Sequence, residues 1–306
     1  MPELLSDDEL TELASGQPEA PEGPGRQVYQ YVRPLAAAAD DYLDMLLNDE
    51  GRWMFGIRPL DAMIRGTGRG ELTFITGKAH SGKTQLALQS IANNPDKRVV
   101  LFTPDEVDAL VLSKLVSVTR AIPSDELEKM IQARHEDTVR MVRRVAEETF
   151  SNLVVQHDSL TFEQMEVTVK ETEQMLGGRV DAVFIDYLEL LPGEGGYTGL
   201  TEKSQALKRW AKMLEVPVIC LHQASRSSSA RGESGGMEAM RYGGDTEAMH
   251  VLEVYRKKES QELTEQERAQ HEELVTVNIV KNKRPPCLKG EIDLHIHPTC
   301  GQVREL

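Results

Sequence analysis

The sequence predicts an α/β fold with a mostly parallel central sheet and helices on both faces. The first observation is that short apolar segments, such as 72–76 and 180–187, alternate with helical segments along the chain. The second is that polar residues directly follow several of these apolar runs. Because ligands bind beyond the carboxyl ends of parallel strands, we expect the functional residues to meet at that edge of the sheet.

Each predicted element has a local signature. Strands are expected where short runs are apolar and β-branched: 72–76, 98–102, 152–155, 180–187, 216–221, 249–256, 275–281 and 291–296. Helices are expected where apolar residues recur at helical spacing: 84–92, 105–119, a capped helix that opens at Ser124, 137–149, 161–176 and 201–214. A charged helix or loop, 262–272, separates two of the last strands.

Charge divides the 306-residue chain into three predicted parts. Of the net charge of −15, a balance of −10 falls in residues 1–50, which hold twelve acidic residues against two arginines. We expect residues 1–33, rich in Pro and Gly, to form a disordered acidic tail, residues 34–50 a linker helix, and residues 51–306 the folded core. The core then carries only −5, which is compatible with a local basic surface.

Targeting signals and cysteines indicate the compartment. The sequence has no run of eighteen apolar residues and no signal peptide, so we expect neither a membrane-spanning nor a secreted chain. Cys220, Cys287 and Cys300 are odd in number and lack metal-binding spacing, which favours reduced thiols in the cytoplasm.

Residues 77–84 match the phosphate-binding pattern G-x-x-x-x-G-K-[ST], between a predicted strand and a predicted helix. The backbone N–H groups of such a loop and the N-terminus of the helix bind phosphate oxygens. Lys83 is expected over the β- and γ-phosphates of ATP, and the Thr84 hydroxyl is expected to bind Mg²⁺. The predicted nucleotide-binding residues are Gly77, Lys78, Ala79, His80, Ser81, Gly82, Lys83 and Thr84.

Carboxylates lie at the ends of two predicted strands. Asp186 is expected to orient the metal ion and its water, although a strand-end aspartate can also simply form a turn. Asp105 and Glu106 follow the strand 98–102, where a carboxylate can polarise an attacking water or can cap a helix. We favour Glu106 over Asp105 as the catalytic carboxylate because its side chain reaches further.

Gln223 follows the strand 216–221 and is expected to sense the γ-phosphate, unless it is a strand-end residue without function; His222 is interpreted as a packing residue. The segment 224–244 is rich in Gly and Ser and contains three arginines. It is expected either to follow a DNA backbone without reading bases or to be an ordinary surface loop. The three arginines are Arg226, Arg231 and Arg241.

A dense cationic run, 281–286, follows another predicted strand. Its charged residues are Lys281, Lys283 and Arg284. A neighbouring molecule can supply such cations to neutralise charge in phosphoryl transfer, and we count the three as candidate catalytic residues on this ground. The alternative is a solvated charge cluster.

Taken in order, these motifs resemble the C-terminal motor domain of DnaB-type replicative helicases, a hexameric branch of the RecA-like ATPases. The similarity extends from about Tyr42 to the C-terminus. Several independent motifs in one order are more specific than any one of them. The matching segments are Tyr42 to Asp44, Gly56 to Asp61, the phosphate loop, Phe102 to Glu106, Ile185 to Leu191, Val216 to Gln223 with Arg226, Tyr255-Arg256 and the cationic run.

The resemblance implies a RecA-like P-loop core over residues 51–306 and an ATP-dependent DNA helicase that moves along single-stranded DNA at a replication fork. ATP would lie between the subunits of a homo-oligomeric ring, expected to be a hexamer. Helix 34–48 would dock on the adjacent subunit, and 224–244 and the Gly-rich 193–199 would face the channel. A primase or a helicase loader is a further expected partner, in the cytoplasm of a bacterium or of a phage-infected host.

The chain also departs from the family pattern. Family members usually carry a helical N-terminal collar that engages primase, and fifty mostly acidic residues are not expected to form one. The family's Lys-x-Arg finger falls on Lys281 and Lys283, with Arg284 one place late, and the family's catalytic position falls on Asp105. Two other functions stay open: a recombinase or strand-annealing ATPase of the same superfamily, and an ATP-gated assembly or regulatory module without motor activity.

Overall fold

The computed structural model describes residues 35–39, 42, 43, 47, 51–193, 196–223, 247–260 and 263–306. The chain divides into two compact units, 1–50 and 51–306. In the first unit the described residues are helical: η1 is a 3₁₀ turn (Leu35–Ala38), and residues 39, 42, 43 and 47 follow in helical conformation. The predicted acidic tail, 1–33, lies outside the described residues.

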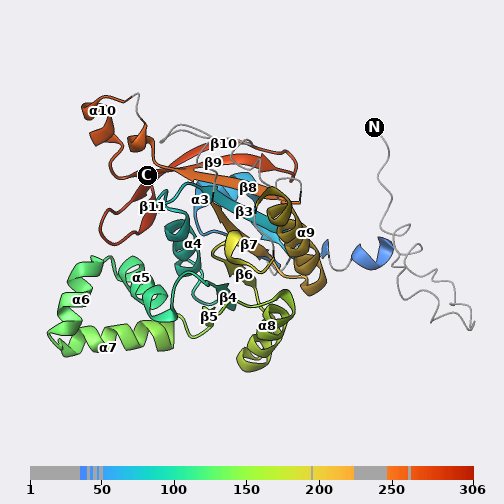
Figure 1. Ribbon diagram of the computed structural model, residues 1–306, viewed down its shortest axis with the longest axis horizontal. Helices are drawn as coiled ribbons and strands as arrows, with labels where there is room; N and C mark the ends of the chain where they lie inside the picture. The colour runs from blue at the N-terminus through green and yellow to red at the C-terminus, as the bar shows by residue number, and fades with distance from the viewer. Residues whose placement is uncertain are drawn as a thin grey trace, which may run out of the picture. The chain divides into compact units, whose positions relative to one another are not determined.

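A mixed sheet forms the centre of the second unit (Figure 1). Among the described residues it has nine strands in the order β11-β10-β9-β8-β3-β7-β6-β4-β5. Neighbours from β8 to β5 are parallel, whereas β9, β10 and β11 are each antiparallel to the strand beside them. The strands are β3 (Leu72–Gly77), β4 (Val99–Phe102), β5 (Leu153–Gln156), β6 (Ala182–Ile185), β7 (Val218–Gln223), β8 (His250–Tyr255), β9 (Leu274–Asn282), β10 (Gly290–Ile296) and β11 (Val303–Glu305).

Helices and turns connect these strands. Two short strands, β1 (Arg52–Trp53) and β2 (Thr67–Gly68), pair with each other before the main sheet begins. None of the described helices combines the length and the apolar composition needed to cross a membrane. The helical elements are α3 (Arg58–Ile64), α4 (Lys83–Ala92), α5 (Asp108–Arg120), α6 (Ser124–Gln132), α7 (Glu136–Arg144), the π-turn η2 (Val145–Thr149), α8 (Phe162–Leu176), η3 (Leu188–Leu190), α9 (Gly196–Leu214), η5 (Lys257–Glu259) and α10 (Glu265–Gln270).

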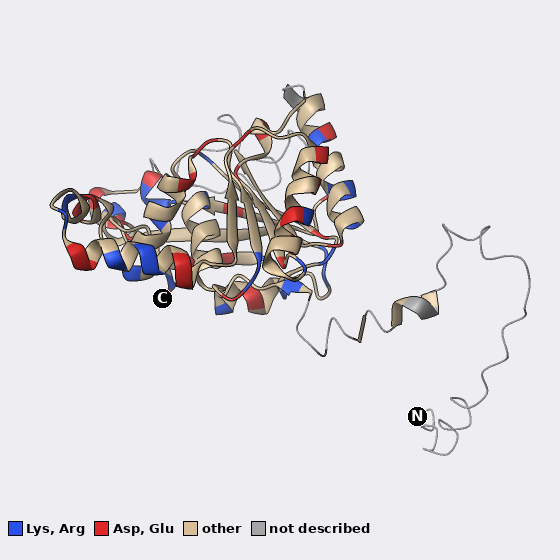
Figure 2. Ribbon diagram, turned by 90° about the horizontal axis from the view of Figure 1, so that it is seen from below, with Lys and Arg blue, Asp and Glu red and all other residues tan. Residues whose placement is uncertain are grey.

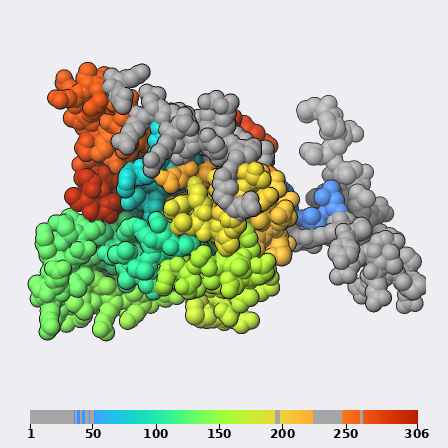
Figure 3. Space-filling view, in the orientation of Figure 1, coloured from blue at the N-terminus to red at the C-terminus, as the bar shows by residue number. Residues whose placement is uncertain are grey.

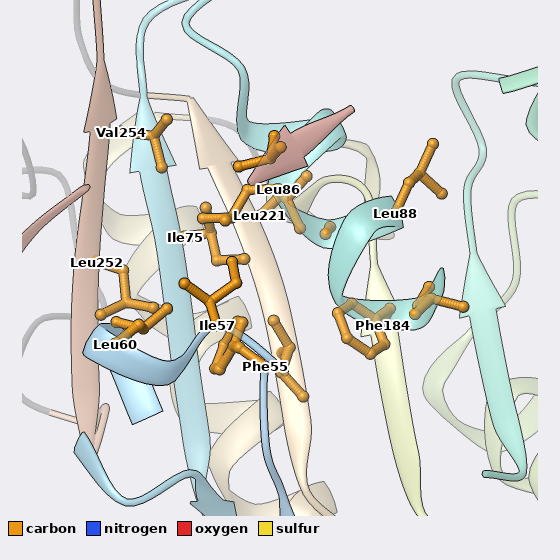
Figure 4. Close-up of a cluster of buried hydrophobic side chains, with 14 of the residues drawn as sticks. Phe55, Ile57, Leu60, Ile75, Leu86, Leu88, Phe184, Leu221, Leu252 and Val254 are labelled. Atoms are coloured by element: carbon orange, nitrogen blue, oxygen red, sulfur yellow. The ribbon is translucent and has the colours of Figure 1, made fainter. Parts of the chain in front are cut away.

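Two apolar clusters cover the two faces of the sheet, because successive residues of a strand point to opposite sides. Ile75 of β3 belongs to the cluster shown in Figure 4, together with Leu86 of α4. Phe74, the preceding residue, belongs to the second cluster with Met165 of α8 and Trp210 of α9. The predicted α/β fold with a mostly parallel sheet is therefore confirmed.

The surface carries most of the charge. Lys, Arg, Asp and Glu lie mainly on helices and connecting segments, whereas the central strands hold few of them (Figure 2). The helices α5, α6 and α7 lie together on one flank of the second unit (Figure 3, green). Their many exposed ion pairs, such as Arg140 with Glu136 and Asp137, contribute little stability each.

The parallel register gathers polar residues at one edge of the sheet. Gly77, where the phosphate loop begins, lies opposite Gln223. Phe102 lies opposite Ile185, so Asp186 follows immediately beside the end of β4. The functional candidates of three strands are thus neighbours in space although far apart in sequence.

Some predicted boundaries differ from the structure. α5 begins at Asp108, three residues later than predicted, because a backbone turn precedes it. Ser124 starts α6 but does not cap it; its Oγ instead lies 3.2 Å from Oγ of Ser117. α9 begins at Gly196, so the later part of the Gly-rich segment is helical.

His250 is a titratable group in the interior, with a fully buried side chain. Its Nδ1 lies 3.1 Å from Oγ1 of Thr73. Burial, and then the Arg284 guanidinium, lower the pKa of His250 to about 3, although a hydrogen bond with Asn282 raises it. The folded protein therefore keeps this imidazole neutral at pH values where the unfolded chain binds a proton.

We predict that this group lowers the free energy of unfolding as the pH falls from about 6.5 towards 3, by up to about 1.4 kcal/mol per pH unit. The variant His250→Gln cannot take up the proton, so its stability should decline less steeply. Urea unfolding at several pH values gives the slope of the free energy of unfolding against pH for the parent and for His250→Gln. His157 is exposed, and the variant His157→Gln serves as the control. Equal slopes in the parent and His250→Gln would contradict the prediction.

Candidate active site

The phosphate loop connects the end of β3 to the start of α4, and its geometry requires two of its glycines. Gly82, the N-cap of α4, has a φ of 104°, which other residues rarely adopt. A Cβ at Gly77 would lie 2.3 Å from the carbonyl oxygen of Val254 on β8. The loop therefore passes too close to the neighbouring strand for any side chain at Gly77.

Lys83, the first residue of α4, lies back over the loop. Its Nζ donates hydrogen bonds to the backbone oxygens of Gly77 (2.8 Å) and Lys78 (2.7 Å). Burial lowers the pKa of Lys83, whereas the Asp186 and Glu189 carboxylates raise it. An ammonium group in this place can bind the phosphates that such a loop surrounds.

Thr84 and Asp186 meet at the same edge. Oγ1 of Thr84 donates a hydrogen bond of 2.9 Å to Oδ2 of Asp186, and the Asp186 N–H donates to the backbone oxygen of Phe102 (2.8 Å). Burial raises the pKa of Asp186 to about 6; the Thr84 hydroxyl lowers it and Glu106 raises it further. Hydroxyl and carboxylate oxygens are ligands that Mg²⁺ prefers. Within the described ranges, no group of three or more His, Cys, Asp or Glu could hold a metal.

The candidate catalytic carboxylates lie on the turn before α5. Glu106 is partly buried and forms an ion pair with Lys114 of α5, whereas Asp105 is exposed. The N-cap of α5 is Val107, and no side chain caps this helix. The alternative interpretation of Asp105 or Glu106 as a helix cap is therefore wrong.

Gln223 and His222 end β7. Gln223 lines the same cavity as the phosphate loop. His222 is buried, with its ring centroid 6.2 Å from that of Phe74, as expected of a packing residue. It also has a polar neighbour that the sequence did not indicate, because its Nδ1 lies 2.9 Å from Oε1 of Glu189 in η3.

One cavity of about 450 Å³ brings most of these side chains together at the carboxyl edge of the sheet. The sequence-predicted residues that line it are Ala79, His80, Ser81, Gly82, Lys83, Thr84, Asp105, Glu106, Asp186 and Gln223. Sequence reasoning gave no role to the other lining residues, Gln85, Lys114, Tyr187, Arg256, Ile296, His297, Pro298 and Gly301.

The missed residues reach the cavity by different routes. Arg256 had a weak signal, since it belongs to a segment that resembles the family. Residues 296–301 had none, because they come to the cavity only through the packing of the last strand. That packing is seen where the Val303 N–H of β11 donates to Oε1 of Gln89 on α4 (2.9 Å).

The cationic segment 281–284 lies at the other edge of the sheet. β9 is antiparallel to β8, so Asn282 pairs with His250, which lies beside the start of β3. Arg284 forms an ion pair with Glu71, the residue directly before β3. The segment is thus at the opposite end of β3 from its own phosphate loop. Arg226, Arg231 and Arg241 lie outside the described residues.

Sequence comparison relates the chain to bacterial replicative helicases. It is 30% identical to the replicative DNA helicase DnaB of Nostoc sp. over 186 residues, an alignment that covers 58% of this chain and 21% of that protein. It is 25% identical over 223 residues to DnaB of Geobacillus stearothermophilus, over 68% of this chain and 48% of that protein. It is 28% identical over 275 residues to DnaB of Mycoplasma pneumoniae, over 82% of this chain and 56% of that protein. The chain thus spans between 21% and 56% of the length of these relatives.

Two solved structures share the fold. A DnaB-like replicative helicase, described with its interactions with primase, has a TM-score of 0.71 at 20% identity, over 98% of this chain and 71% of that one. The second structure, which is an ATPase domain, has a TM-score of 0.73 at 21% identity, over 89% of this chain and 99% of that one. The sequence-family model of the DnaB-like helicase C-terminal domain matches residues 54–303 of this chain. This range contains the phosphate loop, Asp186 and the cationic segment. The chain belongs to the family of DnaB-like helicase C-terminal domains.

Proposed function

We propose that this chain is an ATP-dependent DNA helicase that translocates on single-stranded DNA at a replication fork, as a hexameric ring with ATP between subunits. One observation carries the proposal: the phosphate loop, Asp186 and Glu106 line a cavity at one edge of the sheet, and the cationic segment 281–284 lies at the other. Two such incomplete halves complete each other when copies are arranged head to tail, and such an arrangement forms a ring when the rotation between neighbouring copies closes. Membership of the family supports the same function.

The cavity residues fit ATP with Mg²⁺. The loop N–H groups and Lys83 would bind the β- and γ-phosphates, and Thr84 and Asp186 would hold the ion directly or through its water. The oxygen-only donor pair, 2.9 Å apart, is the feature that fits Mg²⁺. The ion would neutralise charge on the phosphate oxygens during transfer.

Glu106 is the proposed carboxylate that polarises the attacking water. It lines the cavity, and its ion pair with Lys114 holds it there. Asp105, exposed on the same turn, is the alternative. Gln223 lines the cavity at the end of β7 and would sense the γ-phosphate there. It is followed in sequence by 224–244, so the state of the nucleotide could be passed to that segment.

DNA and protein partners follow from this assignment. Arg226, Arg231 and Arg241 are proposed to contact DNA phosphates without reading bases. Helix 34–48 is proposed to dock on an adjacent subunit, where its apolar residues, such as Leu47, would supply the docking face. A primase or a helicase loader is a further proposed partner, in the cytoplasm of a bacterium or of a phage-infected host.

The proposed cation that acts across the boundary is Lys283, with Lys281, and not Arg284. The Arg284 guanidinium is held by Glu71, with side chains only 12% and 16% exposed. The Arg284 N–H donates to Oδ1 of Asn282 (3.0 Å), whose Nδ2 donates to the backbone oxygen of Met63 (3.1 Å). Lys283, which lies between Asn282 and Arg284, is exposed. Its place in the sequence is also that of the family's finger.

The proposed function predicts that single-stranded DNA stimulates ATP hydrolysis and that the protein unwinds a forked duplex. Lys83→Ala should lower hydrolysis by about 100-fold or more, because the phosphates lose their buried cation. Phosphate release with and without DNA measures hydrolysis and its stimulation, and separation of the strands of a forked duplex measures unwinding. Helical filaments with strand exchange but no unwinding would support a recombinase instead, and turnover indifferent to DNA would support a regulatory module.

A second prediction concerns the metal. Asp186→Asn should raise the Mg²⁺ concentration needed for half-maximal hydrolysis by about 10-fold or more, since it removes the carboxylate charge but keeps the shape. Thr84→Ser keeps the hydroxyl and serves as the matched control, with an expected change below about 3-fold. Titration of hydrolysis with Mg²⁺ gives the comparison. If Asp186→Asn and the parent have the same Mg²⁺ dependence, the metal role is wrong.

A third prediction tests the cation across the boundary. Lys283→Ala alone should lose about 10³-fold or more in hydrolysis. Mixing it with Lys83→Ala subunits should restore part of the activity, because each supplies the half that the other lacks. Lys289→Ala, an exposed lysine nearby, is the control and should behave as the parent.

Arg284→Ala should act differently in the same assay. It leaves Glu71 largely buried without its partner, so we expect a loss of about 3 kcal/mol in the free energy of unfolding. Mixing Arg284→Ala subunits with Lys83→Ala subunits should then not raise hydrolysis, because Arg284→Ala keeps the proposed cation, Lys283. Complementation by Arg284→Ala, and none by Lys283→Ala, would reverse the assignment.

A further inference from the structure

β7 extends further than its neighbour β6 at the carboxyl edge of the sheet. The ladder between the two strands ends where Ile185 pairs with Cys220, three residues before Gln223. The Gln223 N–H therefore has no strand carbonyl to meet on this side. It donates instead to Oε1 of Glu189, at 2.9 Å. A side-chain carboxylate thus takes the place of a backbone acceptor at the last residue of β7.

Glu189 belongs to η3, the short turn that begins two residues after Asp186. The same carboxylate oxygen that bonds Gln223 also lies 2.9 Å from Nδ1 of the buried His222. The backbone oxygen of Glu189 accepts a hydrogen bond of 3.0 Å from Nζ of Lys203 on α9. Both the main chain and the side chain of Glu189 are therefore held in place, on the turn that follows Asp186.

We propose that Glu189 is a positioning residue that couples η3, the turn that follows Asp186, to Gln223. A shift of that turn moves the acceptor of the Gln223 N–H, and with it the direction of the Gln223 side chain in the cavity. The proposal deepens the proposed function and rests on it, because it assumes that Gln223 responds to the γ-phosphate. Glu189 itself does not line the cavity.

A carboxylate that accepts a backbone N–H for structural reasons alone is also present in this chain. Oε1 of Glu173 on α8 accepts the N–H of Val180 at 3.0 Å, away from the cavity. Removing either acceptor leaves a backbone N–H without its partner, so both changes should lower stability. Glu173→Ala is therefore a matched control for Glu189→Ala. Glu189→Ala also removes the carboxylate beside His222.

The experiment compares the two alanine variants and Glu189→Gln in the full chain with Mg²⁺ and ATP. Glu189→Ala should keep the affinity for ATP within about 2-fold of that of Glu189→Gln, because both variants lose the charge that raises the pKa of Lys83 and both leave the loop and Thr84 unchanged. It should lose about 10- to 100-fold in kcat and most of the stimulation by DNA. Glu189→Gln keeps an oxygen acceptor and should stay within about 3-fold of the parent. Glu173→Ala should change the melting temperature but neither kcat nor the stimulation.

A double-mutant cycle tests whether Glu189 acts through Gln223. Gln223→Ala and Glu189→Ala should each lower kcat, and the double variant should be no slower than the slower of the two. Additive losses would overturn the coupling, as would parental kcat in Glu189→Ala or an equal loss in Glu189→Gln. If Glu189→Ala does not fold, the cycle is carried out with Glu189→Asp, whose shorter side chain withdraws the acceptor.

The two proposals fail in different ways. If the parent hydrolyses ATP but DNA does not stimulate it, the helicase proposal fails, whereas the split between kcat and ATP affinity in Glu189→Ala still tests the positioning role. If DNA stimulates the parent and Glu189→Ala equally, the helicase proposal stands and Glu189 has no positioning role.

Discussion

The common alignment of the carboxyl ends of β3, β4, β6 and β7 is the constraint on which the rest of the structure depends. Four parallel strands place the phosphate loop, the Glu106 turn, Asp186 and Gln223 at one edge. A slip of one residue in any of these strands would move each of its side chains into the cluster on the opposite face of the sheet. The two buried clusters therefore fix the register, and the register fixes the active site.

Polar side chains inside the protein lie at both edges of this sheet, and the groups that they contact set their orientations. At the amino edge, Glu71 directs the Arg284 guanidinium inwards, and Thr73 meets the neutral ring of His250. At the carboxyl edge, Lys83 and Asp186 are half-buried, and each charge shifts the pKa of the other group. Burying a charge is costly without a partner, so these contacts are specific and leave each group one orientation.

The sequence was sufficient for the fold class and for much of the cavity, because these features depend on local patterns. The phosphate loop has a fixed spacing, and Asp186 directly follows an apolar strand. The turn at 296–301 could not be predicted, since it reaches the cavity only when β11 packs on α4. The orientation of Arg284 and the bond from Gln223 to Glu189 were equally hidden, because each joins residues that are far apart in sequence.

The reversal of the chain at β9 has a kinetic consequence. It carries the cationic segment to the opposite edge from the phosphate loop of the same molecule. On the proposed assignment, a solitary subunit retains nucleotide and leaves it intact. The rate of ATP cleavage would then rise more steeply than in proportion to protein concentration until assembly is complete. The topology of the sheet would thus prevent ATP hydrolysis by unassembled subunits.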